Sequence, residues 1–151
     1  MRSLRVLVLS ILAISVQAQQ EANFVVLPAK ELGTLIATQG TWRPAKIDIE
    51  TAEASISQIA TLKVDEDGDE SNSTFRIDHP ERYFRQYVPI RREGRKLLYV
   101  NAFRTPLSTS DWHTHLVVVF DGQSSFWQAL YDPATNKYSH LKVNGIASNH
   151  D

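Results

Sequence analysis

The sequence predicts an α+β domain in which one main amphipathic helix packs on a four-stranded antiparallel meander. The helix is predicted from apolar residues that recur at steps of three and four after Pro44. The strands are predicted from segments rich in Tyr, Phe, Val, Ile and Leu that follow one another after residue 82 with short turns between them. Because strands joined by short turns pair antiparallel, the order of a helix followed by strands implies this meander.

The N-terminus has the pattern of a secretory signal peptide. Arg2 and Arg5 precede the apolar run of residues 6–16, and Val16-Gln17-Ala18 places compact residues before a cleavage site. The run is shorter than the roughly 20 residues that span a bilayer, and we expect no transmembrane segment in the mature chain. We expect cleavage after Ala18 and a secreted or periplasmic product. The expected organisation is a signal peptide at 1–18, an N-terminal segment at 19–41, a single α+β domain at 42–147 and a tail at 148–151.

The elements before the meander follow from apolar spacing and from proline and glycine. Residues 24–27 are a short apolar run that suggests an edge strand, and residues 30–38 predict a short helix that Gly40 would close. Residues 45–62 are the main helix, because Pro44 suits a first helical turn and because five apolar side chains share one face. They are Ile49, Ala52, Ile56, Ile59 and Ala60.

The strand-like segments are separated by turn sequences. Glu93-Gly94 lies where a two-residue hairpin turn is expected, and Asp121-Gly122 marks another turn. Residues 116–120 are apolar on both faces, which is typical of a central strand. Five segments are strand-like, one more than the four strands of the predicted meander: residues 83–92, 95–104, 112–120, 126–131 and 138–143.

Several short motifs, taken in order, make the chain resemble a group of known proteins. The motifs are Trp42-Arg43-Pro44, residues 83–87, residues 98–103, residues 118–122, Phe126-Trp127, residues 131–135 and Asn144-Gly145. In this order they resemble small exported bacterial proteins of unassigned function, and the order of elements is similar to cystatin-like folds, which host inhibitors, binding modules and enzymes. Members of the exported group often carry a cysteine and a second glycine around the Asp-Gly turn, where this chain has Phe120 and Gln123. The resemblance therefore implies no thiol role and no catalytic residues.

The composition excludes several function classes. The chain has 151 residues, with 16 Lys and Arg against 17 Asp and Glu, so its formal net charge is −1. This balance argues against a nucleic-acid partner, because such binding depends on neutralising phosphates. The chain has no cysteine, which excludes disulfides, thiolate zinc sites, a thiol nucleophile and a lipoprotein anchor.

One candidate site is a metal centre at Asp111, His113 and His115. On a strand these alternate residues share a face, and two imidazoles with one carboxylate are a known ligand set for transition metals. The alternative interpretation is the solvated start of a strand that directs Trp112, Leu116 and Val118 inward.

A second candidate is a calcium loop at Asp65, Asp67 and Asp69. Carboxylates at the first, third and fifth positions match such a loop, but Glu70 replaces the glycine at position six and Arg76 replaces the glutamate at position twelve. A solvated acidic loop is the alternative.

The remaining candidates are residues that could contact a partner. A basic cluster around Arg91 and Arg95 could meet an anionic surface, although strand ends often carry solvated charge. Aromatic residues of the strands, among them Tyr99 and Trp127, could mark a recognition surface or fill the core.

We expect from these features a non-catalytic exported module that binds an unidentified protein or envelope component through its sheet. No cofactor is expected, because the sequence has no phosphate-cradling glycine loop and no recognisable nucleophile or metalloprotease motif. The alternatives are a metal-dependent activity at Asp111, His113 and His115, and a small-molecule pocket between the helix and the sheet. The oligomeric state stays open.

Overall fold

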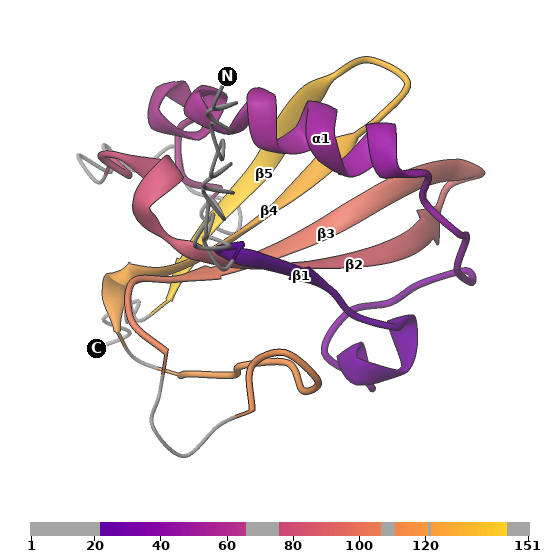
Figure 1. Cartoon of the computed structure of the whole chain (residues 1–151), viewed down its shortest axis with the longest axis horizontal. Helices are drawn as coiled ribbons and strands as arrows, with labels where there is room; N and C mark the ends of the chain where they lie inside the picture. Colours follow the sequence, from indigo (N-terminus) through magenta and orange to yellow (C-terminus); the bar gives the residue numbers. More distant parts are fainter. Residues whose placement is uncertain (1–21, 66–75, 107–110, 121, 145–151) are drawn as a thin grey trace, which may run out of the picture.

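A computed structural model describes residues 22–65, 76–106, 111–120 and 122–144, which form a five-stranded sheet with one α-helix and short 3-10 helices. The strands are ordered β1-β2-β3-β4-β5 across the sheet (Figure 1). Strand β1 runs parallel to β2, and every other neighbouring pair is antiparallel. The elements are β1 (Phe24–Val26), η1 (Ala29–Leu32), α1 (Lys46–Ala54), η2 (Ile56–Thr61), η3 (Pro80–Arg82), β2 (Phe84–Arg92), β3 (Arg95–Phe103), β4 (Gln123–Asp132) and β5 (Lys137–Asn144).

The β2–β3 hairpin turns at Glu93 and Gly94, whose φ angles are 51° and 74°. Two positive φ angles are what a two-residue type I′ turn requires, and such a turn matches the twist of paired strands. The prediction of a hairpin turn at this dipeptide is confirmed.

One face of the sheet is covered by α1 and η2, and we call it the helix face (Figure 1). Helix α1 begins after Ala45, whose N–H donates to the Asp48 carboxylate at 2.7 Å. It ends where the N–H of Ser55 is shared between the carbonyls of Thr51 and Ala52, a tightening that leads into the 3-10 helix. The core beneath includes Ile49, Ala52, Ile56, Ile59, Tyr83, Tyr87, Leu98, Val100, Trp127, Tyr131, Tyr138 and Leu141.

The opposite face, which we call the loop face, is covered by η1 and by the irregular segment of residues 111–120 (Figure 1). Leu27 and Leu32 pack there on Val88 and Ile90. Near residue 112 a separate cluster brings together Phe103, Trp112 and Val117, with Phe84 and Phe126 packed against it. Both faces of the sheet are therefore covered, one by helix and the other by irregular chain.

The predicted four-stranded antiparallel meander under one helix is wrong. The sheet has five strands and one parallel pair, because residues 24–26 pair with β2. Most of the regular structure is sheet. The strands do not form the cystatin-like arrangement that the sequence predicted. Strand β3 pairs directly with β4, so the segment expected between them as a strand, residues 112–120, is left outside the sheet.

Two helix predictions also need correction. The helix expected over residues 45–62 is α-helical only over Lys46–Ala54 and continues as the 3-10 helix Ile56–Thr61. The helix expected over residues 30–38 is a 3-10 turn that ends at Gly33, whose φ of 53° suits glycine, rather than at Gly40.

Among the described residues, no helix has the length and apolar character needed to cross a membrane.

Candidate ligand cavity on the loop face

Three carboxamide side chains lie side by side across the loop face. Gln86, Asn101 and Gln128 occupy neighbouring strands and are direct cross-strand partners. Asn101 Nδ2 donates to Gln86 Oε1 at 2.9 Å, and Gln128 Nε2 donates to Asn101 Oδ1 at 3.2 Å. We call these three residues the amide ladder. Gln86 and Asn101 are buried, where a polar group must find partners.

The amide ladder holds the irregular segment against the sheet. Gln86 Nε2 donates to the carbonyls of Trp112 at 2.6 Å and His115 at 2.7 Å. Asn101 Nδ2 donates to the carbonyl of Val117 at 2.8 Å, and the N–H of Val117 donates to Gln86 Oε1 at 2.9 Å. The side chains of the sheet thus satisfy backbone groups that a strand neighbour would otherwise satisfy. This explains how an apolar segment covers the sheet without becoming a strand.

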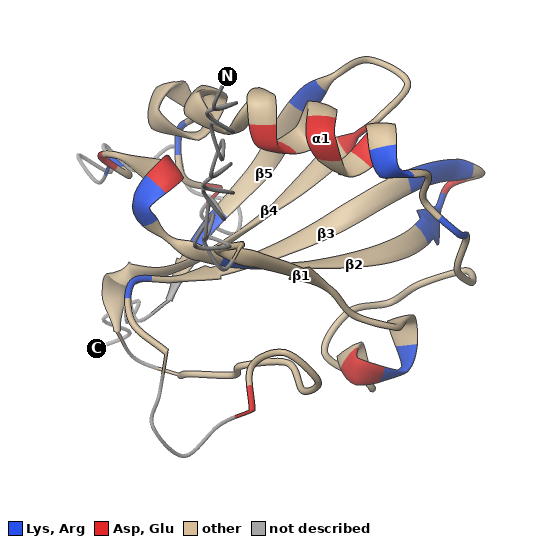
Figure 2. Cartoon of the chain, in the orientation of Figure 1, with Lys and Arg blue, Asp and Glu red and all other residues tan. Residues whose placement is uncertain are grey.

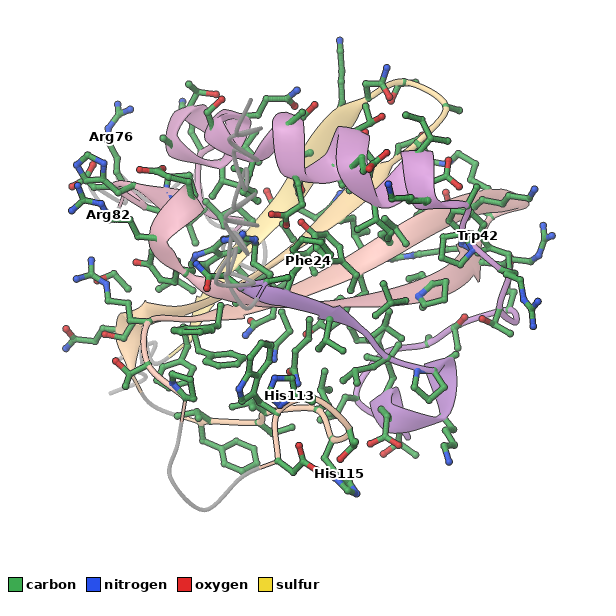
Figure 3. The ribbon with its side chains drawn as sticks, viewed as in Figure 1. Phe24, Trp42, Arg76, Arg82, His113 and His115 are labelled. Carbon is green, nitrogen blue, oxygen red and sulfur yellow. The ribbon has the colours of Figure 1, made fainter. Side chains whose placement is uncertain are left out.

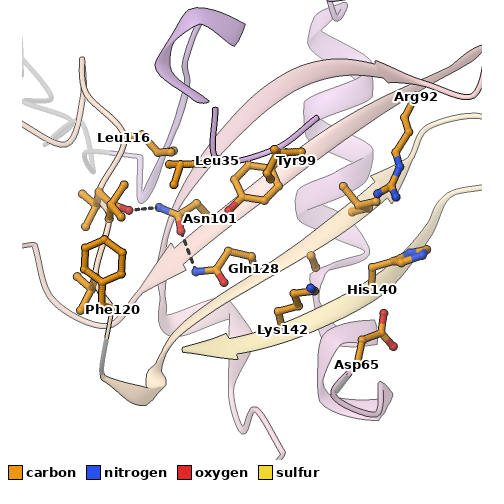
Figure 4. A pocket seen from close by; sticks show the side chains of 16 residues that line it. Leu35, Asp65, Arg92, Tyr99, Asn101, Leu116, Phe120, Gln128, His140 and Lys142 are labelled. Carbon is orange, nitrogen blue, oxygen red and sulfur yellow. Dashed lines mark hydrogen bonds between the residues drawn. The ribbon is translucent and has the colours of Figure 1, made fainter. Parts of the chain in front are cut away.

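Beside the ladder the segment and the sheet border a cavity of about 600 Å³ that is open to solvent. This volume lies within the range of small-molecule sites, roughly 300–1,000 Å³. Figure 4 shows Leu116 and Phe120 at one end of the cavity, and Arg92, His140 and Asp65 at the other. The lining residues are Leu35, Ile36, Asp65, Arg92, Tyr99, Asn101, Leu116, Val117, Val118, Val119, Phe120, Gln128, Ala129, Leu130, His140 and Lys142.

Two uncharged polar groups reach into this mainly apolar space. Tyr99 lines the cavity, and its hydroxyl has no hydrogen-bond partner within the described part of the chain. Burial raises the pKa of Tyr99, so the hydroxyl is neutral at physiological pH and can donate or accept. Gln128 ends the amide ladder and also borders the cavity. These groups can fix the orientation of a ligand whose remainder is apolar.

The two ends of the cavity differ in character. Phe120 is 89% exposed and Val118 is 45% exposed, which is unusual for large apolar side chains. At the other end His140 has a φ of 55° and lies where two residues of β5 oppose one of β4, a β-bulge. The bulge, together with the Val64–Leu141 bridge, places His140 and Asp65 at the rim.

The helix face holds the other prominent polar cluster, and this one is closed. Arg85 is buried, and its guanidinium donates to both oxygens of Glu53 at 2.7 Å. The Tyr87 hydroxyl donates to the same carboxylate, and the Tyr138 hydroxyl donates to the carbonyl of Ala52 at 2.9 Å. Burial lowers the pKa of Arg85 but the hydrogen bond and charge of Glu53 outweigh it, so the pKa is raised. These contacts anchor α1 on the sheet.

Asp111, His113 and His115 lie in a turn and not on a strand. His113 Nδ1 is 3.6 Å from Asp111 Oδ1, whereas His115 Nδ1 is 2.8 Å from the Thr114 hydroxyl. Hydrogen bonds from the Thr114 hydroxyl and the His113 N–H lower the pKa of Asp111. Within the ranges that the structure describes, no three His, Cys, Asp or Glu side chains are grouped as metal ligands. The strand alternation that suggested the site is absent, and the metal site itself stays a prediction.

The calcium prediction falls mostly outside the described residues. Asp67 and Asp69 lie outside them, and only Asp65 is placed. Its N–H donates to the carbonyl of Leu141 at 2.6 Å, and its side chain is at the cavity rim.

The four partner-binding candidates separate into different environments. Trp127 is fully buried on the helix face beside Tyr83, so it cannot form a contact surface. Tyr99 lines the loop-face cavity. Arg91 and Arg95 line a second cleft at the β2–β3 hairpin.

Sequence reasoning missed the amide ladder, although a signal was present. Gln86 and Asn101 interrupt strands that are otherwise rich in apolar residues. Once the register of the hairpin is set from its turn, these two residues face each other. A polar pair at a buried register position indicates that something polar covers it.

Neither family models, curated proteins nor solved structures gave a match to this chain.

Proposed function

We propose that this protein is an exported, non-catalytic binding module that takes a small amphipathic ligand into the loop-face cavity. The observation that carries the proposal is the combination of a mainly apolar space of about 600 Å³ with the Tyr99 hydroxyl and the Gln128 amide at its wall. Ligand sites typically pair an apolar lining with a few placed polar groups. The pocket lies on the face away from α1, not between the helix and the sheet as the sequence suggested.

The chemistry of the walls defines the ligand class. An aliphatic chain would contact Leu35, Leu116 and Leu130, and a hydroxyl, carbonyl or amide would meet Tyr99 and Gln128. Burying an apolar chain contributes about 0.8 kcal/mol per methylene. A ligand of eight to ten carbons would therefore supply most of its affinity through the apolar walls, with the polar groups fixing its direction.

The experiment is a competition assay with N-phenyl-1-naphthylamine, an apolar dye that fluoresces when it leaves water. Decanamide should displace the dye from the purified protein. Tyr99→Phe should weaken decanamide about five- to tenfold, because one hydrogen bond contributes roughly 1 kcal/mol. Tyr83→Phe is a matched control, since its hydroxyl donates to the Ser124 carbonyl away from the lining residues. Equal weakening by both variants would contradict the assignment of Tyr99.

The export part of the proposal rests on the N-terminal pattern of Arg2, Arg5 and Val16-Gln17-Ala18. Mass spectrometry of the protein isolated from its native source should give a chain that begins at Gln19. A chain that retains Met1 would contradict cleavage.

A further inference from the structure

The tip of the β2–β3 hairpin carries two successive cross-strand pairs of like charge. Arg91 lies opposite Lys96, and Arg92 lies opposite Arg95. Like charges directly opposite each other destabilise a sheet. Figure 2 shows blue Lys and Arg positions on both strands at the hairpin end of the sheet. Arg92 lines the loop-face cavity, whereas Arg91 and Lys96 line a different cleft. An anion bound beside Arg91 and Lys96 would remove the repulsion within that pair.

A cleft of about 530 Å³ lies at this place, separate from the loop-face cavity. Its walls come from the hairpin, from the segment before α1 and from the β4–β5 turn. The lining residues are Trp42, Arg43, Ala45, Asp48, Arg91, Gly94, Arg95, Lys96, Asp132, Pro133 and Ala134.

The carboxylates around the cleft are already engaged. Asp132 is 3.6 Å from Arg95, and Glu93 is 3.8 Å from the same guanidinium. Asp48 accepts the N–H of Ala45 at the start of α1. Within the described ranges, Arg43, Arg91 and Lys96 have no carboxylate within 4 Å, so three cations around the cleft lack an anionic partner.

Two of these cations are held in position. Arg91 Nε donates to the carbonyl of Thr41 at 3.2 Å, which leaves the two terminal nitrogens of the guanidinium for a ligand. Lys96 Nζ lies 5.6 Å from the centre of the Trp42 ring. The ring is itself fixed, because Trp42 Nε1 donates to the carbonyl of Leu97 at 3.0 Å. A fixed cation loses less conformational entropy when it binds.

We propose that the cleft between Arg43, Arg91 and Lys96 binds a phosphoryl group. A phosphoryl group carries up to two negative charges and offers oxygens in several directions, which suits three cations from different parts of the fold. Arg91 and Arg43 can each bind two of its oxygens, and Lys96 adds a point charge. The phosphoryl group can belong to a small phosphate ester or to a phospholipid headgroup. This proposal does not depend on the loop-face cavity.

The test follows the Trp42 indole N–H resonance while inorganic phosphate replaces chloride at constant ionic strength. In parallel, the protein is sedimented with phosphatidylglycerol vesicles and with phosphatidylcholine vesicles. The variant Arg91→Gln/Lys96→Gln removes two cleft cations. The control Arg76→Gln/Arg82→Gln removes the same charge from exposed residues on the opposite side of the molecule (Figure 3).

Saturable phosphate binding that the cleft variant weakens at least about tenfold, and the control less than about twofold, supports a small phosphate ligand. Sedimentation of the protein with phosphatidylglycerol vesicles but not with phosphatidylcholine vesicles supports a phospholipid headgroup as the ligand, provided that it is lost in the cleft variant and kept in the control. Absence of both effects overturns the proposal, and so does an equal loss in the two variants. Circular dichroism of the cleft variant should match the unmodified protein, since neither residue is buried in the core.

Discussion

The two faces of one sheet are covered in different ways, and the loop face leaves a mainly apolar cavity above its strands. On the helix face, α1 and η2 place isoleucines against a set of fully buried aromatic rings. On the loop face, residues 111–120 are held through their backbone by Gln86 and Asn101, and a cavity of about 600 Å³ remains beside these contacts.

The difference shows how the type of covering element decides what a sheet face can do. A helix presents a continuous apolar stripe, so its side chains fill the space above the strands. An irregular segment directs backbone carbonyls toward the sheet, and polar side chains of the sheet must donate hydrogen bonds to them. The loop-face cavity lies where side chains of the irregular segment no longer pack on the strands. The helix face therefore supplies stability, whereas the loop face supplies a candidate site.

The largest expected effect is on the helix face, at the Glu53–Arg85 pair. Glu53→Gln leaves the charge of Arg85 buried without its counter-ion, so the free energy of unfolding should fall by about 3 kcal/mol. Glu50→Gln is the matched control, because Glu50 pairs with Lys46 at the surface at 2.8 Å. Its effect should stay within about 0.5 kcal/mol. Urea denaturation measures both, and similar losses would show that the buried pair has no special role.

The next effect is on the loop face, at the amide ladder. Gln86→Leu removes the partners of two carbonyls and of the Val117 N–H. Stability should fall by about 2 kcal/mol, and hydrogen exchange of the Val117 amide should become faster while that of the Tyr87 amide changes only with global stability. The exposed Gln39→Leu should change stability by less than about 0.5 kcal/mol. Unchanged exchange at Val117 would mean that the ladder does not hold the segment.

Alkaline pH should weaken both faces. Burial raises the pKa of Tyr87 and Tyr138 on the helix face and of Tyr99 on the loop face above the ordinary value of 10.0. Above pH 10 the unfolded chain releases protons that the folded protein keeps, so stability present below pH 10 is lost as the pH rises, by up to about 1.4 kcal/mol per unit for each group. Urea midpoints at pH 9, 10 and 11 measure the slope. Tyr138→Phe should make it shallower, and a flat profile would contradict the account.

The smallest expected effect is at the tip of the β2–β3 hairpin. Lys96→Glu converts a like-charged cross-strand pair with Arg91 into an opposite pair. The free energy of unfolding should rise by about 0.5 kcal/mol at low salt, and the gain should shrink in 1 M salt. The exposed Lys63→Glu serves as the control. If Lys96→Glu instead lowers the free energy of unfolding, and salt does not change this loss, then repulsion between Arg91 and Lys96 does not measurably destabilise the hairpin.

Local patterns predicted the β2–β3 hairpin, and long-range pairing decided the rest. The other predicted turn, at Asp121-Gly122, joins no strand of residues 112–120, and Asp121 lies outside the described residues. The turn at Glu93-Gly94 and the strands around it follow from residue types that act over a few positions. The parallel pairing of Phe24 with Arg85 joins segments far apart in the sequence, which periodicity does not report. Residues 116–120 have the composition of a central strand, but β3 and β4 already satisfy each other.

The candidate site was predicted only in part, for the same reason. Tyr99 was named from the sequence as a contact residue, and it borders the cavity. Trp127 was named with it, yet the alternation of β4 directs Trp127 into the helix-face core and Phe126 to the loop face. Sequence alone could not say which of these neighbours faced inward, because both faces of this sheet are covered.

The central claim is that the loop-face cavity binds a small amphipathic ligand, and a pair of tryptophan substitutions tests it most directly. Leu116→Trp should place an indole ring in one end of the cavity and weaken binding of N-phenyl-1-naphthylamine. Ile47→Trp adds the same ring at a position that is 63% exposed on α1 and away from the lining residues, so binding should be unchanged. Full dye binding by a folded Leu116→Trp protein, or its loss in both variants, would contradict the claim.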